Sequence, residues 1–128
     1  MSVVGKSPMN FPEGYSFGNI GGHFPAELKC AGFDGIVVEG IAPKPVNLWI
    51  TDNKAELRDA SALWGRGAYQ VGKLLQKEHG ERARYITTGV AGENRVRAAV
   101  ITGSNESSST GGFAAHFSPQ IPSGSDLS

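Results

Sequence analysis

The stretch from Asn19 to Gly40 constrains the fold more than any other part of this chain. Its apolar residues Phe24, Leu28 and Ala31 recur at spacings of four and three, which places them on one face of a helix. Pro25 agrees with this interpretation, because proline is tolerated in the first turn of a helix. The pattern therefore predicts a helix that begins near Phe24 and buries one face.

A glycine and a short apolar run follow this helix. Gly32 can adopt the positive φ that commonly ends a helix. The run from Gly35 to Val38 comes next and predicts a buried strand. The whole stretch therefore indicates a turn, a helix, a second turn and a strand.

Asn19, Gly21 and Gly22 form a polar turn directly before the helix and are the best candidates for ligand contact. Backbone N–H groups at the start of a helix are unpaired, and the helix dipole adds partial positive charge there. Glycines leave room for an anion, and a phosphate is the natural example. The same residues also suit an ordinary capped helix, since asparagine is a common cap residue. Both interpretations stay open on these residues alone.

The composition limits the class of protein. The 128 residues suit one domain with a real core, and the formal net charge of zero predicts neither nucleic acid nor an acidic membrane as a partner. Cys30 is the only cysteine, so the chain can form no intrachain disulfide, and its place within the predicted helix suits a small core residue. The sequence shows no signal peptide and no apolar run of transmembrane length. We therefore expect a cytoplasmic protein.

The rest of the secondary structure is predicted from alternation, helical spacing and turn residues. Strands are expected at 2–6, 46–51, 55–58, 82–88 and 96–102, the second and third of them forming a hairpin. A second amphipathic helix is expected at 67–79, and turns or loops at 9–18, 90–94 and 103–110. Residues 118–128 are expected to form a disordered tail.

Several motifs of this chain follow the order and nearly the spacing of the landmarks of a known family. They are NIGGHF at 19–24, AELK at 26–29, AGFD at 31–34, IVVEG at 36–40, PV at 45–46, LRDAS at 57–61, LWG at 63–65 and AGEN at 91–94. On these residues the chain resembles the N-terminal domain of the aldehyde ferredoxin oxidoreductases, the tungsten enzymes that carry two pterin cofactors. The resemblance implies an α+β fold with antiparallel or mixed β-sheets and two main helices. Residues 1–117 are then part of the platform that holds the pterins.

The resemblance also implies which residues contact the cofactor. In this family a magnesium ion bridges the phosphates of the two pterins. Asn19 stands where the family offers a backbone carbonyl to that ion, and Ser108 lies in the counterpart loop of the other half. The expected cofactor-binding residues are Asn19, Gly21, Gly22, Gly92, Glu93, Asn94, Ser108, Gly111 and Gly112. Glu93 and Asn94 suit either bonds to the edge of a pterin or bonds that hold their own turn together.

Two glycine pairs, at 21–22 and 111–112, each follow a polar stretch and come just before an aromatic residue. In the resembled family they belong to the two halves of a pseudo-symmetric platform, one half for each pterin. This chain departs from the family in two places. The loop 106–112 contains no arginine, whereas many members have one in or near it. After Phe117 the chain lacks the second helix and strand, so we expect it to be truncated there.

The activity that the resemblance implies is oxidation of an aldehyde to a carboxylic acid at a tungsten, or molybdenum, held by the two pterins. Electrons then pass through an iron–sulfur cluster to ferredoxin in the full-length enzyme, and one cysteine cannot hold that cluster. We therefore interpret the chain as a fragment that contributes the pterin platform and no catalytic residue. The alternative is a non-catalytic module, either a stand-alone phosphate or pterin binder or an accessory subunit. An uncovered sheet face predicts self-association.

Overall fold

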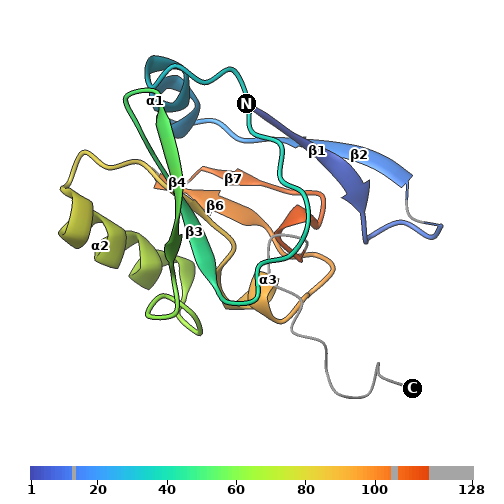
Figure 1. Cartoon of the computed structure of the whole chain (residues 1–128). Coiled ribbons are helices and arrows are strands. Elements are labelled where there is room, and N and C mark those ends of the chain that lie inside the picture. The colour runs from blue at the N-terminus through green and yellow to red at the C-terminus, as the bar shows by residue number, and fades with distance from the viewer. Residues whose placement is uncertain (13, 105–106, 116–128) are drawn as a thin grey trace.

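The computed structural model describes residues 1–12, 14–104 and 107–115. The elements in chain order are β1 (Ser2–Ser7), β2 (Gly14–Asn19), α1 (Phe24–Cys30), β3 (Val46–Thr51), β4 (Lys54–Asp59), α2 (Ala68–His79), β5 (Ile86–Thr87), α3 (Gly89–Glu93), β6 (Ile101–Gly103), β7 (Ser108–Ser109) and the 3₁₀ turn η2 (Phe113–Ala115) (Figure 1). The strands pair antiparallel in three small sheets, β1–β2, β3–β4 and β5–β6–β7. The predicted α+β class is confirmed, and the tail expected at 118–128 lies outside the described residues.

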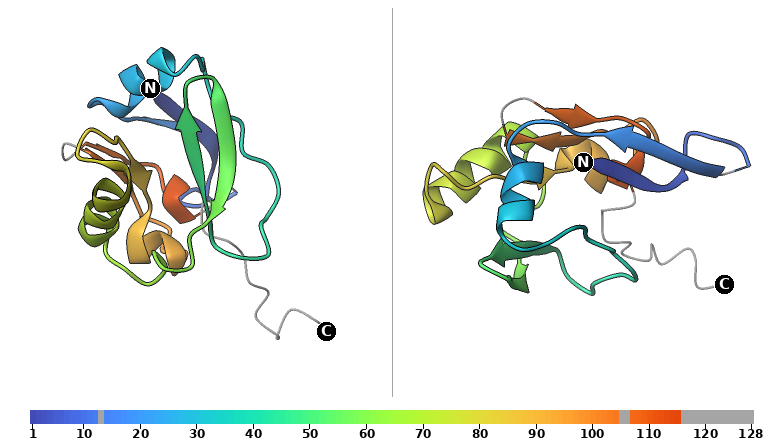
Figure 2. Two further views of the ribbon diagram at one scale, coloured as in Figure 1. Left: turned by 60° about the vertical axis from the view of Figure 1, so that its left-hand side comes forward. Right: turned by 90° about the horizontal axis from the view of Figure 1, so that it is seen from above.

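The sheets form two layers. Figure 2 shows the β3–β4 hairpin standing apart from the layer that contains β1–β2 and β6–β7, with α1 between them. A small cluster of buried side chains forms the core at the side of β6. Its members are Ile20, Ala99, Ile101 and Ala114, with Val3 and Ile86 packed against them. This core therefore joins the segment after β2 to the C-terminal part of the described chain.

The β1–β2 hairpin corrects one prediction. A loop was expected at 9–18, but residues from Gly14 onward form β2 and pair with β1, with Ser7 opposite Gly14 and Ser2 opposite Asn19. The aromatic residues Tyr15 and Phe17 alternate with more buried neighbours, as in a strand with one solvent face. Glycine and proline indicated a loop, but pairing with β1 outweighs that local preference.

The predicted first helix is confirmed, with Leu28 on its buried face and Gly32 just beyond its end at φ +92°. The expectation for Cys30 is wrong, because this residue is exposed and ends the helix. Cys30 follows Leu28 by two positions, about 200° around the helix axis. It therefore points away from the side on which Leu28 is buried.

No strand forms at Gly35–Val38, so the prediction of a buried strand there is wrong. Val37 is 86% exposed and Val38 is 63% exposed. A strand needs a neighbour for its backbone groups, and within the described residues this segment pairs with none. An apolar sequence alone therefore does not make it a strand.

The β3–β4 hairpin and the helix at Ala68–His79 both agree with the sequence predictions. Asp52 and Asn53 form the two-residue turn of the hairpin with positive φ angles of 35° and 64°. On the face of the hairpin that includes Trp49, the indole ring stacks on the His79 ring with 3.9 Å between centroids. This contact joins the hairpin to the end of α2.

The two later strands are much shorter than predicted. Strands were expected at 82–88 and 96–102, but only Ile86–Thr87 and Ile101–Gly103 pair. The turn expected at 90–94 contains the short helix α3, and its N-cap residue Thr88 has helical backbone angles. Among the described residues, no helix is long and apolar enough to cross a membrane.

Asp59 provides a prediction on pH dependence. The backbone N–H of Ser61 donates to Asp59 Oδ1 at 2.9 Å, and this bond holds the pKa of the carboxyl below its ordinary value of 3.8. The bond therefore stabilises the fold above pH 3.8, and its contribution is lost as the pH falls through the lowered pKa. We expect an NMR titration of Asp59 to give a midpoint below 3.8, and a Ser61→Pro variant, which lacks this N–H, to return it toward 3.8. An unchanged midpoint in the variant would contradict this cause.

Candidate functional site

The second glycine of each pair adopts a similar positive φ, whereas the first glycines differ, since Gly111 has φ +103° and Gly21 has no positive φ. Gly22 has φ +78° and Gly112 has φ +74°. Each lies three residues after the end of a strand, β2 for the first pair and β7 for the second, and each is followed closely by a helical turn. The repetition seen in the sequence therefore extends to the φ of the second glycine and to its place between a strand and a helical turn.

The first turn lies against the loop that joins β6 to β7. A Cβ atom built on Gly22 would lie 3.0 Å from Ser107 Oγ and 3.3 Å from the carbonyl oxygen of Ser104. Gly21 is exposed, and a Cβ built on it would meet no atom within 4 Å. Gly22 is thus closely backed by the loop, while Gly21 faces open space.

The second turn lies against the loop between β1 and β2 and against the backbone at Arg97. A Cβ atom built on Gly112 would overlap the carbonyl oxygen of Arg97 and lie 3.1 Å from side-chain atoms of Pro8 and Met9. The hydroxyl of Ser7, a residue only 2% exposed, donates to the carbonyl oxygen of Gly111 at 2.8 Å. These contacts hold the second turn to the end of β1.

Close contact between β2 and β7 relates the two turns. A Cβ atom on Gly18 would lie 2.5 Å from Ser109 Oγ and from the carbonyl oxygen of Thr110. Gly22, further along the chain, instead meets residues that precede β7. The chain segments therefore run in opposite directions past each other, and the two glycine turns lie at opposite ends of this contact.

Asn19 and Ser108, the predicted metal-contacting residues, are both exposed ends of strands. Asn19 Oδ1 accepts a hydrogen bond from Ser2 Oγ at 2.9 Å, and Asn19 lies opposite Ser2 in the β1–β2 ladder. Ser108 pairs with Thr102 in the β6–β7 ladder. Within the described residues, no group of three or more His, Cys, Asp or Glu side chains is placed to hold a metal ion.

The AGEN motif is tied into local structure. Gly92 is buried, and a Cβ on it would lie 2.8 Å from the carbonyl oxygen of Ala114, so α3 packs closely on η2. Glu93 Oε2 accepts from the backbone N–H of Gly65 at 2.9 Å, and Asn94 Nδ2 donates to the carbonyl oxygen of Val90 at 2.9 Å. The Asn94 side chain thus holds its own turn together, and the Glu93 side chain ties this turn to the distant segment at Gly65. Contact with a cofactor stays a prediction.

Two hydroxyl residues beside the first turn were not among the predicted site residues. Ser104 is 3% exposed, and its buried Oγ has no hydrogen-bond partner among the residues that the structure describes. Ser107 Oγ donates to the carbonyl oxygen of Ser104 at 3.3 Å. A buried hydroxyl without a partner is unusual and calls for a bound water, ion or ligand. Nothing in a run of serines tells which hydroxyl is buried, so no sequence signal identifies them.

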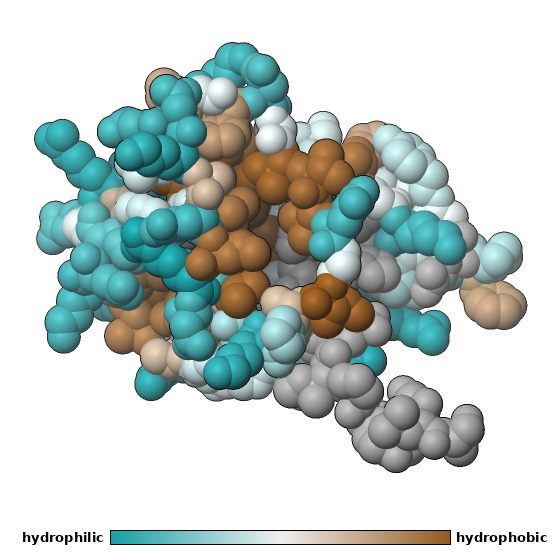
Figure 3. Space-filling view, in the orientation of Figure 1, coloured by the Kyte–Doolittle hydropathy of each residue, from teal (hydrophilic) through white to brown (hydrophobic). Residues whose placement is uncertain are grey.

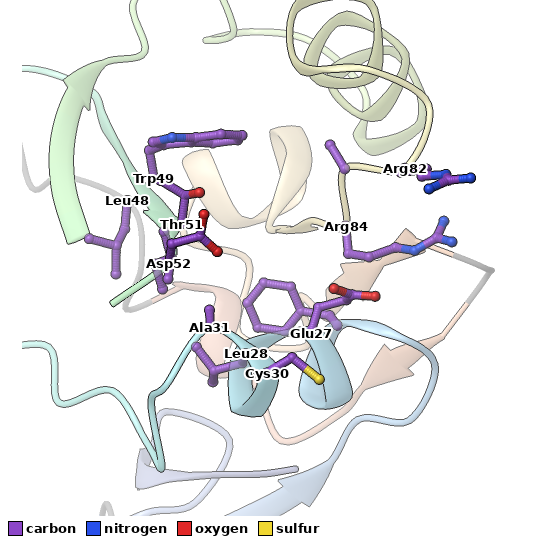
Figure 4. A pocket seen from close by; sticks show the side chains of 13 residues that line it. Glu27, Leu28, Cys30, Ala31, Leu48, Trp49, Thr51, Asp52, Arg82 and Arg84 are labelled. Atoms are coloured by element: carbon purple, nitrogen blue, oxygen red, sulfur yellow. The ribbon is translucent and has the colours of Figure 1, made fainter. Parts of the chain in front are cut away.

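A pocket of about 260 Å³ lies elsewhere, between α1, β3 and the segment 82–84 (Figure 4). Glu27, Trp49 and Arg84 are among its lining residues, and the buried Arg84 Nε meets no hydrogen-bond partner within the described part of the chain. None of the predicted cofactor-binding residues lines this pocket. The predicted site is therefore a surface formed by backbone turns, and this pocket is not part of it.

The fold is that of an α+β domain in which two glycine turns lie at the two ends of the contact between β2 and β7. The family model described as "Aldehyde ferredoxin oxidoreductase, N-terminal domain" matches residues 1–119. The chain belongs to this family, as the sequence motifs predicted.

Relatives and a solved structure agree with this assignment. The tungsten-containing aldehyde ferredoxin oxidoreductase of Pyrococcus horikoshii is 43% identical over 116 residues, which cover 88% of this chain and 19% of that protein. The enzyme of the same name from Thermococcus kodakarensis is 46% identical over 102 residues, covering 78% and 16%. A solved structure, the active-site complex BamBC of benzoyl coenzyme A reductase with 1,5-dienoyl-CoA, contains a similar chain. The match has a TM-score of 0.80 at 40% sequence identity, and it covers 89% of this chain and 17% of the chain in that complex. The chain thus corresponds to the N-terminal region and spans about a fifth of the length of these proteins.

Proposed function

We propose that this chain forms the pterin-binding platform of a tungsten-containing aldehyde ferredoxin oxidoreductase. The observation that carries the proposal is the pair of glycine turns, with φ of +78° and +74°, at the two ends of the contact between β2 and β7. A pseudo-symmetric platform needs one such turn for each pterin of a bis-pterin cofactor. Membership of the family and the names of the relatives support the assignment.

The residues of the first turn fit a phosphate-bearing ligand. Gly21 leaves open space at the surface, and the unpartnered hydroxyl of Ser104 lies in the loop behind Gly22. We assign one pterin phosphate to this turn and the second to Gly111 and Gly112. Backbone amides and hydroxyls suit phosphate oxygens without a cationic side chain.

The remaining assignments concern the metal and the edge of the cofactor. Asn19 and Ser108 offer oxygen atoms to a bridging magnesium ion, which prefers oxygen ligands. Gly92 lets α3 pack closely on η2 and so positions Glu93 and Asn94, which exchange their bonds to Gly65 and Val90 for bonds to a pterin edge. When bound, the tungsten or molybdenum bis-pterin supplies the oxidation of an aldehyde to a carboxylic acid. This chain binds and orients that group through residues 1–117 and contributes no catalytic residue.

The other parts of the reaction belong to the full-length enzyme. The single Cys30 cannot hold an iron–sulfur cluster, so the cluster and the contact with ferredoxin are assigned to the remaining domains. We place the enzyme in the cytoplasm and expect no nucleic acid or membrane as a partner. We also expect the isolated chain to associate with itself through an uncovered sheet face.

The test is the cofactor content of the chain, purified from a host that synthesises the bis-pterin cofactor. Tungsten and molybdenum are measured by mass spectrometry and pterin by fluorescence after oxidation. We expect the chain to retain pterin, and Gly21→Leu to lose most of it, because the added side chain occupies the space that the ligand needs. Gly21 has open surroundings, so this variant should stay folded.

Gly35→Leu is the matched control, since Gly35 is also exposed and free of neighbours within 4 Å but lies outside the site. It should retain as much pterin as the unchanged chain. Purified, folded chain without pterin would overturn the proposal. Equal pterin content in the two leucine variants would remove Gly21 from the site.

A further inference from the structure

The β4 strand is exposed at the edge of its hairpin and has an apolar face turned outward. Leu57 is 69% exposed, and its cross-strand neighbour Leu48 is 40% exposed. Figure 3 shows apolar surface around a hollow beside β3 and β4, and part of it lies over the segment that joins α1 to β3 in Figure 1. A two-stranded sheet is marginal by itself and a sheet of more strands is more stable, so this hairpin is expected to pair with further strands.

The outer edge of β4 has free backbone groups. Within the described part of the chain, β4 pairs with β3 alone. The two-residue turn makes Thr51 and Lys54 the first hydrogen-bonded pair of the hairpin, and such pairs alternate along an antiparallel ladder. Ala55, Leu57 and Asp59 therefore direct their N–H and C=O groups away from β3, toward the free edge.

We propose that two copies of this chain associate through β4, antiparallel and centred on Leu57, so that two β3–β4 hairpins join into one four-stranded sheet. In this register the outward N–H and C=O groups of the two copies face each other. Leu57 lies opposite Leu57 of the second copy, and Ala55 lies opposite its Asp59. It also continues the apolar face from one copy into the other. Centring on Ala55 or Asp59 would bring much less of the two strands into contact.

Charge complementarity favours a second copy as the partner. In this register Glu56 lies opposite Arg58 of the other copy, on the face away from Leu57, and the pair occurs twice. Opposite charges directly across an antiparallel ladder are favourable, and like charges are unfavourable. The formal net charge of zero also removes overall repulsion between copies. Within one copy, Arg58 and Glu56 already form an ion pair, so both side chains lie on the same face.

Sedimentation velocity of the cofactor-free chain tests the proposal. We expect a dimer, and we expect Glu56→Arg or Arg58→Glu to raise the dissociation constant about tenfold or more, since each change creates two like-charge pairs. The double variant E56R/R58E restores opposite charges in this register and should restore the dimer. Circular dichroism checks that each variant folds, because Arg58 also lies over the Trp49 ring at 5.0 Å.

A disulfide provides an independent readout. In a Cys30→Ser background, Leu57→Cys should form a cross-linked dimer on mild oxidation, because residues paired across a ladder lie within the distance that a disulfide spans. Lys54→Cys is the control, since two such residues would lie about 20 Å apart along the strands. A monomer at the highest soluble concentration, or a dimer that no charge reversal weakens, would overturn the proposal. Neither result bears on pterin retention, which is measured separately.

Discussion

Replacing Gly112 by alanine is expected to destabilise the fold by about 2–5 kcal/mol, the sum of the strain of a positive φ and of steric overlap. Gly112 has φ +74°, and an added Cβ would overlap the carbonyl oxygen of Arg97, which is backbone and cannot rotate away. Side-chain atoms of Pro8 and Met9 lie on the same side, at 3.1 Å. The variant must therefore either open the second glycine turn or move two loops. Urea unfolding followed by circular dichroism measures the loss.

Gly40 offers a matched control for this experiment. It has φ +78°, yet a Cβ built on it would meet no atom within 4 Å. Gly40→Ala therefore carries the backbone strain alone and should cost only about 1–2 kcal/mol. Equal losses in the two variants would show that the close approach to Arg97 does not hold the second turn.

Shortening Ile20 to alanine is expected to cost about 2–5 kcal/mol, the range measured for large-to-small changes in protein cores. Ile20 is 1% exposed and packs with Ile101 and Ala114, so the lost methyl groups leave a cavity where the β2 segment meets the C-terminal part of the chain. Thermal or urea unfolding measures the change.

Ile41→Ala is the matched control, because Ile41 is 60% exposed and undergoes the same chemical change. We expect it to change the free energy of unfolding by less than about 0.5 kcal/mol. If the two variants were equally stable, the small cluster around Ile20 would not be the core of this domain.

Part of the candidate site could be predicted because glycine carries a backbone requirement. Gly22 and Gly112 both adopt the positive φ that glycine accommodates without strain, and the sequence singles out both pairs. Ser104 and Ser107 could not be found in the same way. Their importance depends on burial and on contact with the segment at Gly22, which lies far away in the chain.

The sequence by itself determined the elements that depend on neighbouring residues. Helical spacing placed α1 and α2, and alternation with a two-residue turn placed the β3–β4 hairpin, because their hydrogen bonds close within a few residues or across one turn. Tertiary structure decided the rest. Pairing with β1 made a strand of Gly14–Asn19, and the lack of a partner left Gly35–Val38 without one. Strands depend on contacts between distant segments, so local preference cannot decide them.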